Sequence, residues 1–229
     1  MSLTTSAIET AVGDILKAVG AWRTGHFLLT SGLHSDQYMQ CQRVMQYPQF
    51  GNLLADLLVE KLFESGIKPD VVVGPALGAV HWEVFVASAL ERKRHTNFDD
   101  YFLKANSIEK AIEPSHIDSM VKAVFAERAA GSDDFAIRRG IELERGIKVF
   151  VVEDVTTTGG SARKVVELLK SMGADPVGVG AIVDRSGGSA TFDVPFISLL
   201  KLSLATYQPE ACPLCKDGSV AEKPGSSKK

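Results

Sequence analysis

The chain has 229 residues, with a hydrophobic fraction of 45%, a charged fraction of 23% and a formal net charge of −3. This length suits one α/β domain, or one domain with a small appendage. The weak negative charge argues against a general nucleic-acid-binding protein, which needs a basic surface. The N-terminal residues lack a signal-peptide pattern, and no apolar run approaches the roughly 20 residues that cross a bilayer. We therefore expect a cytoplasmic protein that binds neither nucleic acid nor membrane.

Apolar residues at helical spacing predict a helix over residues 5–19, and Pro48 opens a second helix with a leucine-rich face. Between them, residues 25–32 form a short β-like run that a Ser-Gly turn closes. Asp70 to Gly74 is almost wholly apolar, the pattern of a strand buried on both faces. A glycine-containing loop follows it, and then an apolar helix extends through about Leu90.

Residues 91–118 are rich in charged and polar side chains, so we expect an inserted surface excursion with a helix near 106–112. Residues 121–125 and 135–139 are strand candidates on either side of a polar, glycine-containing stretch. The tail from residue 216 to residue 229 is polar and is predicted to be flexible.

The clearest unit lies between residues 148 and 183. Residues 148–152 form a buried strand, 153–161 a Gly- and Thr-rich turn, 162–172 a helix and 177–183 the next strand. Such a βαβ unit is expected to be parallel with a right-handed crossover. With a last strand at 196–202, the alternation predicts an α/β fold: a doubly wound, mainly parallel sheet flanked by helices. Ligands of such sheets bind at the carboxyl ends of the strands.

The turn at residues 153–161 reads Glu-Asp-Val-Thr-Thr-Thr-Gly-Gly-Ser and lies at that carboxyl end. Consecutive backbone N–H groups and hydroxyls at the start of a helix suit a phosphate, and glycines let the backbone approach it closely. The adjacent acids Glu153 and Asp154 suit two ribose hydroxyls, directly or through Mg²⁺. The Walker lysine and the G-x-G-x-x-G spacing are both absent. The alternative is a turn that only connects strand and helix.

This segment resembles the phosphoribosyl pyrophosphate signature of the type I phosphoribosyltransferases, and its wording is similar to that of the orotate phosphoribosyltransferases. Further stretches resemble the same family: residues 25–38 its N-terminal hood, residues 72–78 its pyrophosphate loop, and Asp184-Arg185 the pair whose arginine reads orotate. Residues 212–218 with 223–226 resemble the tail of one bacterial and archaeal branch. The resemblance covers most of the chain except 91–118.

The resemblance implies orotate phosphoribosyl transfer in pyrimidine biosynthesis, with Mg²⁺ as cofactor, in a homodimer. It implies one domain over 1–215 with a hood at 1–47 plus the C-terminal strands, a core at about 48–185 and the 91–118 insertion. Glu153, Asp154 and Arg128 would be catalytic, with Asp154 meeting the metal directly or through water or substrate hydroxyls. Thr157 and Arg185 would contact orotate. Phosphoribosyl pyrophosphate would be held by Glu153, Asp154, Val155, Thr156, Thr157, Thr158, Gly159, Gly160, Ser161, Ala76, Leu77, Gly78 and Arg128.

Some positions depart from the family pattern. Thr30 and Gly78 stand where better-known members carry lysines, and the stretch at 125–134 lacks the Lys- and His-rich composition of their mobile loop. Arg128 is the matching cation there and would reach the pyrophosphate of a neighbouring subunit, with Arg138 and Arg139 as substitutes. A loop near 126–138 is the candidate lid.

Two other functions stay open at this point: transfer to another base, such as a purine, and a non-catalytic regulator that senses phosphoribosyl pyrophosphate. Cys212 and Cys215 form a lone C-x-x-C pair, for which metal binding, redox chemistry and plain tail packing are the alternatives. The histidines show no metal-binding spacing, and His34 is interpreted as a surface residue or as part of the base pocket.

Overall fold

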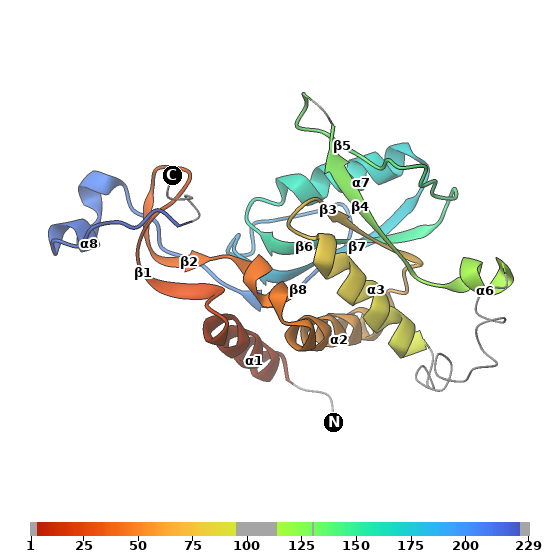
Figure 1. The fold of residues 1–229 in the computed structure, drawn as a ribbon, viewed down its shortest axis with the longest axis horizontal. Helices are drawn as coiled ribbons and strands as arrows, with labels where there is room; N and C mark the ends of the chain where they lie inside the picture. The colour runs from red at the N-terminus through yellow and green to blue at the C-terminus, as the bar shows by residue number, and fades with distance from the viewer. Residues whose placement is uncertain (1–3, 95–113, 130, 225–229) are drawn as a thin grey trace.

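The structure, a computed structural model, describes residues 4–94, 114–129 and 131–224. Its centre is a six-stranded sheet in the order β5-β4-β3-β6-β7-β8 (Figure 1). All neighbouring pairs are parallel except β4 with the two-residue strand β5. The strands are β3 (Val71–Pro75), β4 (Lys122–Arg128), β5 (Phe135–Ala136), β6 (Lys148–Thr156), β7 (Asp175–Asp184) and β8 (Phe196–Lys201). The predicted doubly wound, mainly parallel sheet is confirmed.

The strand order contains a reversal point between β3 and β6. After β3 the chain adds β4 on one side, and later it returns to add β6 on the other side. The loops that leave β3 and β6 therefore diverge from neighbouring strand ends, which in open α/β sheets is where a ligand crevice forms. The two motifs that the sequence analysis singled out, the 74–79 loop and the 153–161 turn, follow these two strands.

Helices cover both faces of the sheet. Helices α1 (Thr5–Ala18), α2 (Pro48–Glu64) and α3 (Val80–Arg94) pack on one face, and α7 (Gly160–Ser171) packs on the other (Figure 1). The Thr4 hydroxyl caps α1 by accepting the Ala7 N–H at 3.3 Å. Pro48 occupies the first turn of α2, where its missing N–H is harmless. None of the helices in the described ranges combines the length and apolarity needed to cross a membrane.

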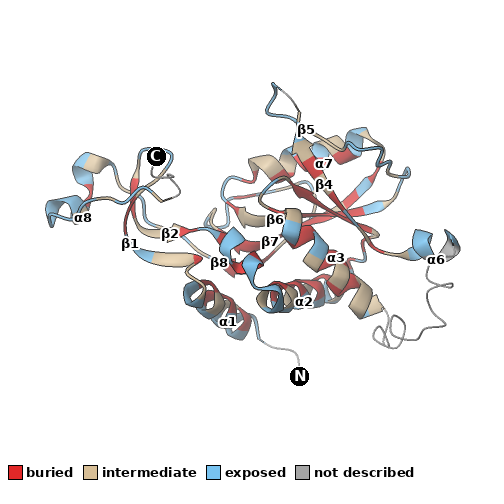
Figure 2. Ribbon diagram, viewed as in Figure 1, coloured by how far each residue is buried: buried red, intermediate tan, exposed pale blue. Residues whose placement is uncertain are grey.

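Buried residues concentrate at the middle of the sheet and on the helix faces against it (Figure 2). Phe150 on β6 is fully buried, and burial of such a side chain stabilises the fold by roughly 1.5–3 kcal/mol. Its ring fits because β7 presents Gly180 beside it. A Cβ at Gly180 would lie 2.6 Å from the ring, which no packed core accommodates without displacement.

A separate two-stranded antiparallel sheet joins β1 (Trp22–Leu28) to β2 (His34–Met39), followed by the short 3₁₀ helix η1 (Cys41–Gln46). The sequence predicted only a β-like run at 25–32. The strand begins earlier, at Trp22, and β2 was missed because its residues, His-Ser-Asp-Gln-Tyr-Met, are too polar for a periodicity argument.

The other predicted elements lie within a few residues of the observed ones. Residues 91–94, assigned to the insertion, form the last turn of α3, and the short helix α6 (Pro114–Ser119) precedes β4. The helix expected near 106–112 lies outside the described residues.

The prediction of a flexible tail from residue 216 stays a prediction, and the structure pairs this tail with β1 at Glu222. After the 3₁₀ helix η3 (Pro209–Ala211) and helix α8 (Pro213–Lys216), the chain returns to β1. Glu222 N–H donates to His26 O, and Leu28 N–H donates to Glu222 O, each at 2.8 Å. The Arg23 guanidinium also contacts the Glu222 carboxylate, at 2.9 and 3.3 Å. Backbone pairing with a distant strand orders this segment, and its composition gave no sign of that.

Candidate functional site

The end of β6 and the start of α7 form the turn that was expected to hold a phosphate. Thr157 and Thr158 are exposed, and Gly159 adopts a left-handed conformation with φ of 76° immediately before the helix. No side chain caps this helix end, so its first N–H groups are available to an anion. Gly160 and Ser161 are the first two residues of the helix. The turn therefore has the geometry of a helix N-terminal anion site.

Glu153 and Asp154 lie just before this turn and are only partly accessible. Burial, with the neighbouring Asp154 charge as a second cause, raises the pKa of Glu153 to about 8. Burial also raises the pKa of Asp154, although the Val155 N–H, donating to Asp154 Oδ1 at 2.8 Å, opposes the rise. Two confined acids with raised pKa values are typical of a functional site. A cation or a pair of hydroxyl donors would stabilise their ionised forms.

The loop after β3 lies against this acid pair. A Cβ placed on Gly78 would be 3.2 Å from Asp154 Oδ1, so the two predicted motifs meet here. Ala76 N–H donates to Ala126 O of β4 at 2.7 Å, and the Ala76–Leu77 peptide bond is cis. Leu77, which lies between Ala76 and Gly78 in this predicted loop, is largely exposed.

Glu83 of α3 fixes the base of the same loop and was missed by the sequence analysis. Its buried carboxylate accepts the Gly74 N–H at 3.0 Å, and burial raises its pKa to about 8 despite that bond. A Cβ on Gly74 would lie 2.9 Å from Glu83 Oε2. The sequence did contain a signal for this role. Glu83 is an acid in an otherwise apolar stretch of helix directly after a glycine-containing loop.

Arg185 follows β7 and is half-buried near the acid pair. Its backbone N–H donates to Thr156 O at 2.8 Å, which ties the ends of β6 and β7 together. Burial lowers the pKa of Arg185, and its ionisable neighbours include Cys41 from the β2–η1 segment. Cys41 is buried and responds electrostatically to both Asp154 and Arg185. The structure thus brings Arg185 and Asp154 together around a cysteine that the sequence analysis did not connect with the site.

Two polar atoms of this region are buried without a hydrogen-bond partner within the described residues: Thr156 Oγ1 and Arg185 Nε. Unpaired buried polar atoms are rare in folded proteins, and each calls for an explanation. Both lie at the strand ends where a ligand is expected.

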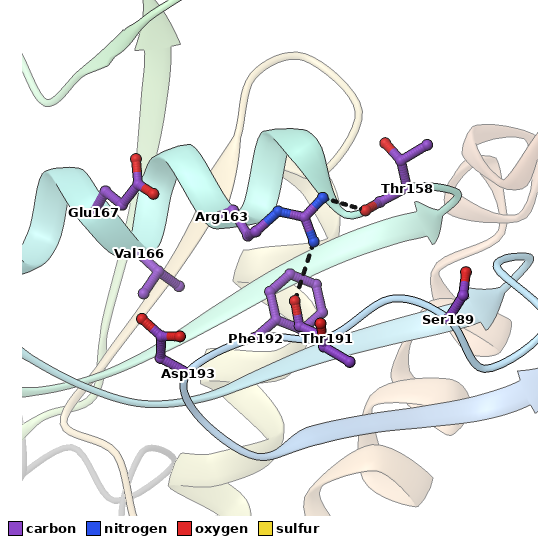
Figure 3. Close-up of a pocket in the computed structure, with 8 residues that line it drawn as sticks. All are labelled: Thr158, Arg163, Val166, Glu167, Ser189, Thr191, Phe192 and Asp193. Atoms are coloured by element: carbon purple, nitrogen blue, oxygen red, sulfur yellow. Dashed lines mark hydrogen bonds between the residues drawn. The ribbon is translucent and has the colours of Figure 1, made fainter.

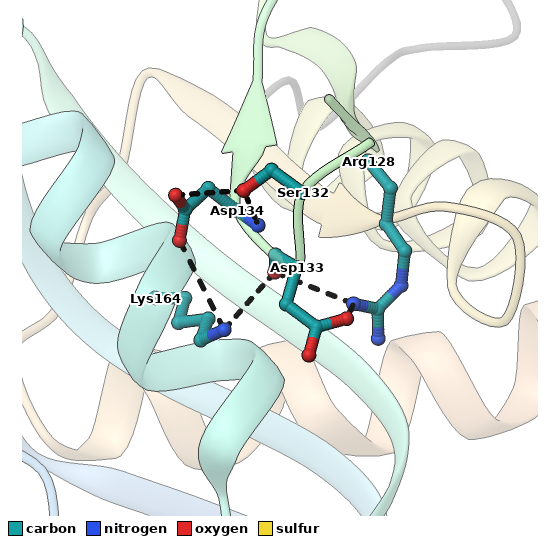
Figure 4. Close-up of polar contacts among 5 residues, drawn as sticks. All are labelled: Arg128, Ser132, Asp133, Asp134 and Lys164. Atoms are coloured by element: carbon teal, nitrogen blue, oxygen red, sulfur yellow. Dashed lines mark hydrogen bonds and ion pairs between the residues drawn. The ribbon is translucent and has the colours of Figure 1, made fainter. Parts of the chain in front are cut away.

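Arg128 was predicted to be a catalytic cation. Within the described residues, its contacts are with residues of its own loop and not with the acid pair or Arg185. It ends β4, and its guanidinium donates to Asp133 Oδ1 at 3.0 Å and lies 5.2 Å from the Phe135 ring centroid. Figure 4 shows Lys164 of α7 reaching the same loop, 3.1 Å from Asp133 O and 3.9 Å from Asp134 Oδ1. Arg128 is thus engaged by its own loop. Arg139, one of its proposed substitutes, lies 3.5 Å from Glu127 Oε2.

A cavity of about 630 Å³ borders the phosphate-binding turn at Thr158 but does not contain the acid pair or Arg185. Figure 3 shows Arg163 at its centre, donating to Thr158 O and Thr191 O, with the Phe192 ring beneath it. These bonds hold the exposed turn against the β7–β8 connection.

Comparison with known proteins agrees with this geometry. Residues 42–209 match the phosphoribosyl transferase domain family. The chain is 44% identical to the orotate phosphoribosyltransferase of Thermotoga maritima over 94% of this chain and 97% of that one. It superposes on the orotate phosphoribosyltransferase of Aeropyrum pernix with a TM-score of 0.61 at 24% identity, covering 83% and 93% of the two chains. The adenine phosphoribosyltransferase of Saccharomyces cerevisiae shares the fold, with a TM-score of 0.56 at 18% identity over 83% and 99%.

Proposed function

This chain belongs to the orotate phosphoribosyltransferases of pyrimidine biosynthesis, and from that membership we propose how its residues act. The substrates are phosphoribosyl pyrophosphate and orotate, and the products are orotidine 5′-phosphate and pyrophosphate. The observation that carries the assignment of residues is the meeting of two loops, where Gly78 lies beside Asp154 at the reversal point of the sheet.

The turn from Thr156 to Ser161 holds the 5′-phosphate. Its support is the uncapped start of α7, the left-handed Gly159 and the exposed hydroxyls of Thr157 and Thr158. An N-terminal helix end favours an anion through its free N–H groups and its dipole. The buried Thr156 hydroxyl, which lacks a partner in the described residues, is a further donor for this ligand.

Glu153 and Asp154 accept hydrogen bonds from the two ribose hydroxyls. In the free protein their pKa values are raised by burial, so binding of donors or of a cation favours loss of the carboxyl protons. Mg²⁺ fits this donor set, because it prefers carboxylate oxygens and substrate phosphates. Asp154 would hold it, directly or through water or the substrate hydroxyls. When bound, Mg²⁺ supplies positive charge that stabilises the departing pyrophosphate.

The loop at 76–78 receives the pyrophosphate, since Gly78 of this loop adjoins Asp154. As pyrophosphate leaves, C1′ gains positive character, and N1 of orotate attacks from the opposite face. Cationic side chains that meet the developing negative charge lower the barrier. Arg128 supplies this charge to the site of a neighbouring subunit, so the working unit is a homodimer. The loop near 126–138 is the lid that excludes water.

Arg185 reads the base together with Thr157. Orotate carries a carboxylate, and a guanidinium binds a carboxylate through two parallel hydrogen bonds. Arg185 Nε is buried without a partner among the described residues, so this side chain has an unused donor near the acid pair. A cytoplasmic location belongs to the same proposal, because phosphoribosyl pyrophosphate is a polyanion that does not cross membranes unaided.

The test follows the loss of orotate absorbance by the purified protein with Mg²⁺ and phosphoribosyl pyrophosphate. Adenine, hypoxanthine and uracil are assayed in parallel, since the shared fold of an adenine enzyme leaves the base undecided by fold alone. We expect turnover of orotate only, with one pyrophosphate released per orotate consumed. Turnover of a purine instead would contradict the role of Arg185. Binding of phosphoribosyl pyrophosphate without turnover of any base would indicate a sensor.

Replacing Asp154 with Asn tests the acid pair. The change removes the charge and keeps the shape, so the fold should persist while kcat falls by roughly 100- to 1,000-fold, as for loss of one preorganised electrostatic contact. Unchanged kcat in a folded D154N protein would remove Asp154 from the mechanism.

A further inference from the structure

Four side chains with metal-binding atoms converge beside the β1–β2 hairpin, away from the site described above. They are His26 and His34 from the hairpin, and Cys212 and Cys215 from the C-terminal segment. Their four candidate ligand atoms all lie within 4.8 Å of one another. The sequence analysis found no metal spacing among the histidines, because the hairpin pair and the cysteine pair are 186 residues apart in the chain.

The separations of these atoms match a tetrahedral zinc site. Zinc bonds of about 2.0–2.1 Å to nitrogen and 2.3 Å to sulfur place tetrahedral ligand atoms about 3.3–3.8 Å apart. Here Cys212 Sγ and Cys215 Sγ lie 3.5 and 3.7 Å from His26 Nε2, and Cys215 Sγ lies 3.3 Å from His34 Nδ1. The two ring nitrogens are 2.9 Å apart. To complete the tetrahedron, the two rings would part by a few tenths of an ångström, and the widest separation of the set, up to 4.8 Å, would close by about 1 Å.

The second nitrogen of His26 supports the same reading. His26 Nδ1 lies 3.1 Å from the Ser219 carbonyl oxygen, which can only accept a hydrogen bond. The proton of His26 is therefore held on Nδ1, and the Nε2 lone pair faces the cluster. A backbone carbonyl that fixes the tautomer in this way is the usual outer partner of a zinc-bound histidine.

The chemistry of the ligands selects zinc over Mg²⁺. Two thiolates and two imidazoles are soft and borderline donors, whereas Mg²⁺ prefers oxygen. Four protein ligands leave no open position, which is typical of a structural site. His26, His34 and Cys212 are buried, so three of the four ligands are shielded from solvent.

We propose that His26, His34, Cys212 and Cys215 bind one structural zinc ion that fastens the C-terminal segment to the β1–β2 hairpin. Figure 1 shows α8 beside this hairpin, at one side of the molecule. Around the site the two segments already pair: His34 N–H donates to Tyr207 O and Tyr207 N–H to His34 O, each at 2.8 Å. The ion adds a cross-link between segments that otherwise share a few backbone bonds and the Arg23–Glu222 ion pair.

The experiment measures metal content of the full chain, purified without chelators and with the thiols kept reduced. We expect close to one equivalent of zinc per chain, lost in each of H26Q, H34Q, C212S and C215S. Matched controls are C41A, a buried cysteine outside the cluster, and H81Q, an exposed histidine; both should retain the zinc. Removal of zinc by a chelator should lower Tm, and added ZnCl₂ should restore it.

A second measurement covers variants that fail to fold. Wild-type protein exchanged with Co²⁺ should show the visible absorption of a tetrahedral ion with thiolate charge transfer, and C215S, which is expected to lose the ion, should lack this absorption. Three outcomes would overturn the proposal: no zinc bound even after ZnCl₂ is added, a Cys212–Cys215 disulfide in the freshly purified protein, or zinc retained by all four variants. Each outcome can occur whether or not the protein turns over orotate.

Discussion

The acid pair at the end of β6 is expected to accept hydrogen bonds as carboxylates, but burial in the free protein favours their neutral, protonated forms. Glu153 and Asp154 lie where a sugar diol is expected, and the confinement that shapes this site raises both pKa values. Glu153 has an ordinary pKa of 4.5 and a folded value of about 8. The folded state therefore holds a proton that the unfolded chain releases between these values, and stability falls as pH rises from about 4.5 through 8.

The variant E153Q tests this linkage, since glutamine keeps the neutral form at every pH. We expect the Tm of E153Q to equal or slightly exceed that of wild type at pH 5. At pH 9 the variant should melt higher by roughly 2–4 °C or more, the shift for about 1 kcal/mol in a chain of this size. Thermal scans without Mg²⁺ across this range measure the difference. Parallel curves for the two proteins would contradict the raised pKa.

Arg185 is the residue on which base recognition depends in our proposal. In R185K the point charge of an ammonium replaces the fork of the guanidinium, so one of two hydrogen bonds to orotate is lost. We expect kcat/KM for orotate to fall by roughly 10- to 150-fold, the value of one charged hydrogen bond. Binding of phosphoribosyl pyrophosphate, measured by calorimetry, should stay unchanged. A fall in that affinity would instead indicate that Arg185 contacts phosphoribosyl pyrophosphate rather than orotate.

At the scale of the element, the β6–α7 connection is a helix start kept free of side-chain caps. Gly159 makes this possible, because its φ of 76° lies in the left-handed region and a Cβ there would meet Phe192 at 2.9 Å and Arg163 at 3.0 Å. The Arg163 side chain in turn donates to Thr158 O and Thr191 O and so fixes the turn from outside. The turn that we propose to bind phosphate is thus already shaped in the unliganded structure.

The variant G159A should therefore destabilise the unliganded protein. A left-handed alanine costs about 1–2 kcal/mol, and the contact with Phe192 adds to this, so Tm should fall by roughly 2–8 °C. The matched control is G160A, one residue on, where the added Cβ has its closest neighbour at 3.6 Å and φ is not positive. Equal Tm values for the two variants would show that the turn tolerates a side chain at Gly159.

At the scale of the whole molecule, the proposed division of labour crosses a subunit boundary. Arg128 is bound by its own loop in one chain, through Asp133 and Phe135, whereas the acid pair of that chain lies at the end of β6. If a neighbour's Arg128 completes each site, a chain that lacks Arg128 and a chain that lacks Asp154 can together form one intact site.

Mixing R128A with D154N subunits tests this arrangement. Random pairing at equal amounts makes half of the dimers mixed, and each mixed dimer has one intact site. Activity should therefore recover to about a quarter of wild type after the chains are unfolded and refolded together. Each variant refolded alone is the control. Activity no higher than the mean of the two variants would place Arg128 within its own chain's site, or outside catalysis.

The sequence by itself determined the parts of this protein that depend on local pattern. Consecutive residues predicted the buried strands at 70–74 and 148–152, the helix at 5–19, the helix that Pro48 opens and the acid–threonine–glycine turn, and the observed elements lie within a few residues of these. Because the strands are parallel, placing the turn after one of them already placed it at the ligand edge of the sheet.

The tertiary structure decided whatever depends on residues far apart in the chain. It set Gly78 against Asp154 and Cys41 near Arg185, bound Arg128 into its own loop, and used Glu83 to anchor the loop after β3. It also paired the supposedly flexible tail with β1 and carried Cys212 and Cys215 to the two hairpin histidines. Residue spacing in the sequence predicts a contact only when both residues lie in the same helix or turn. The contacts above form because separate segments pack against each other.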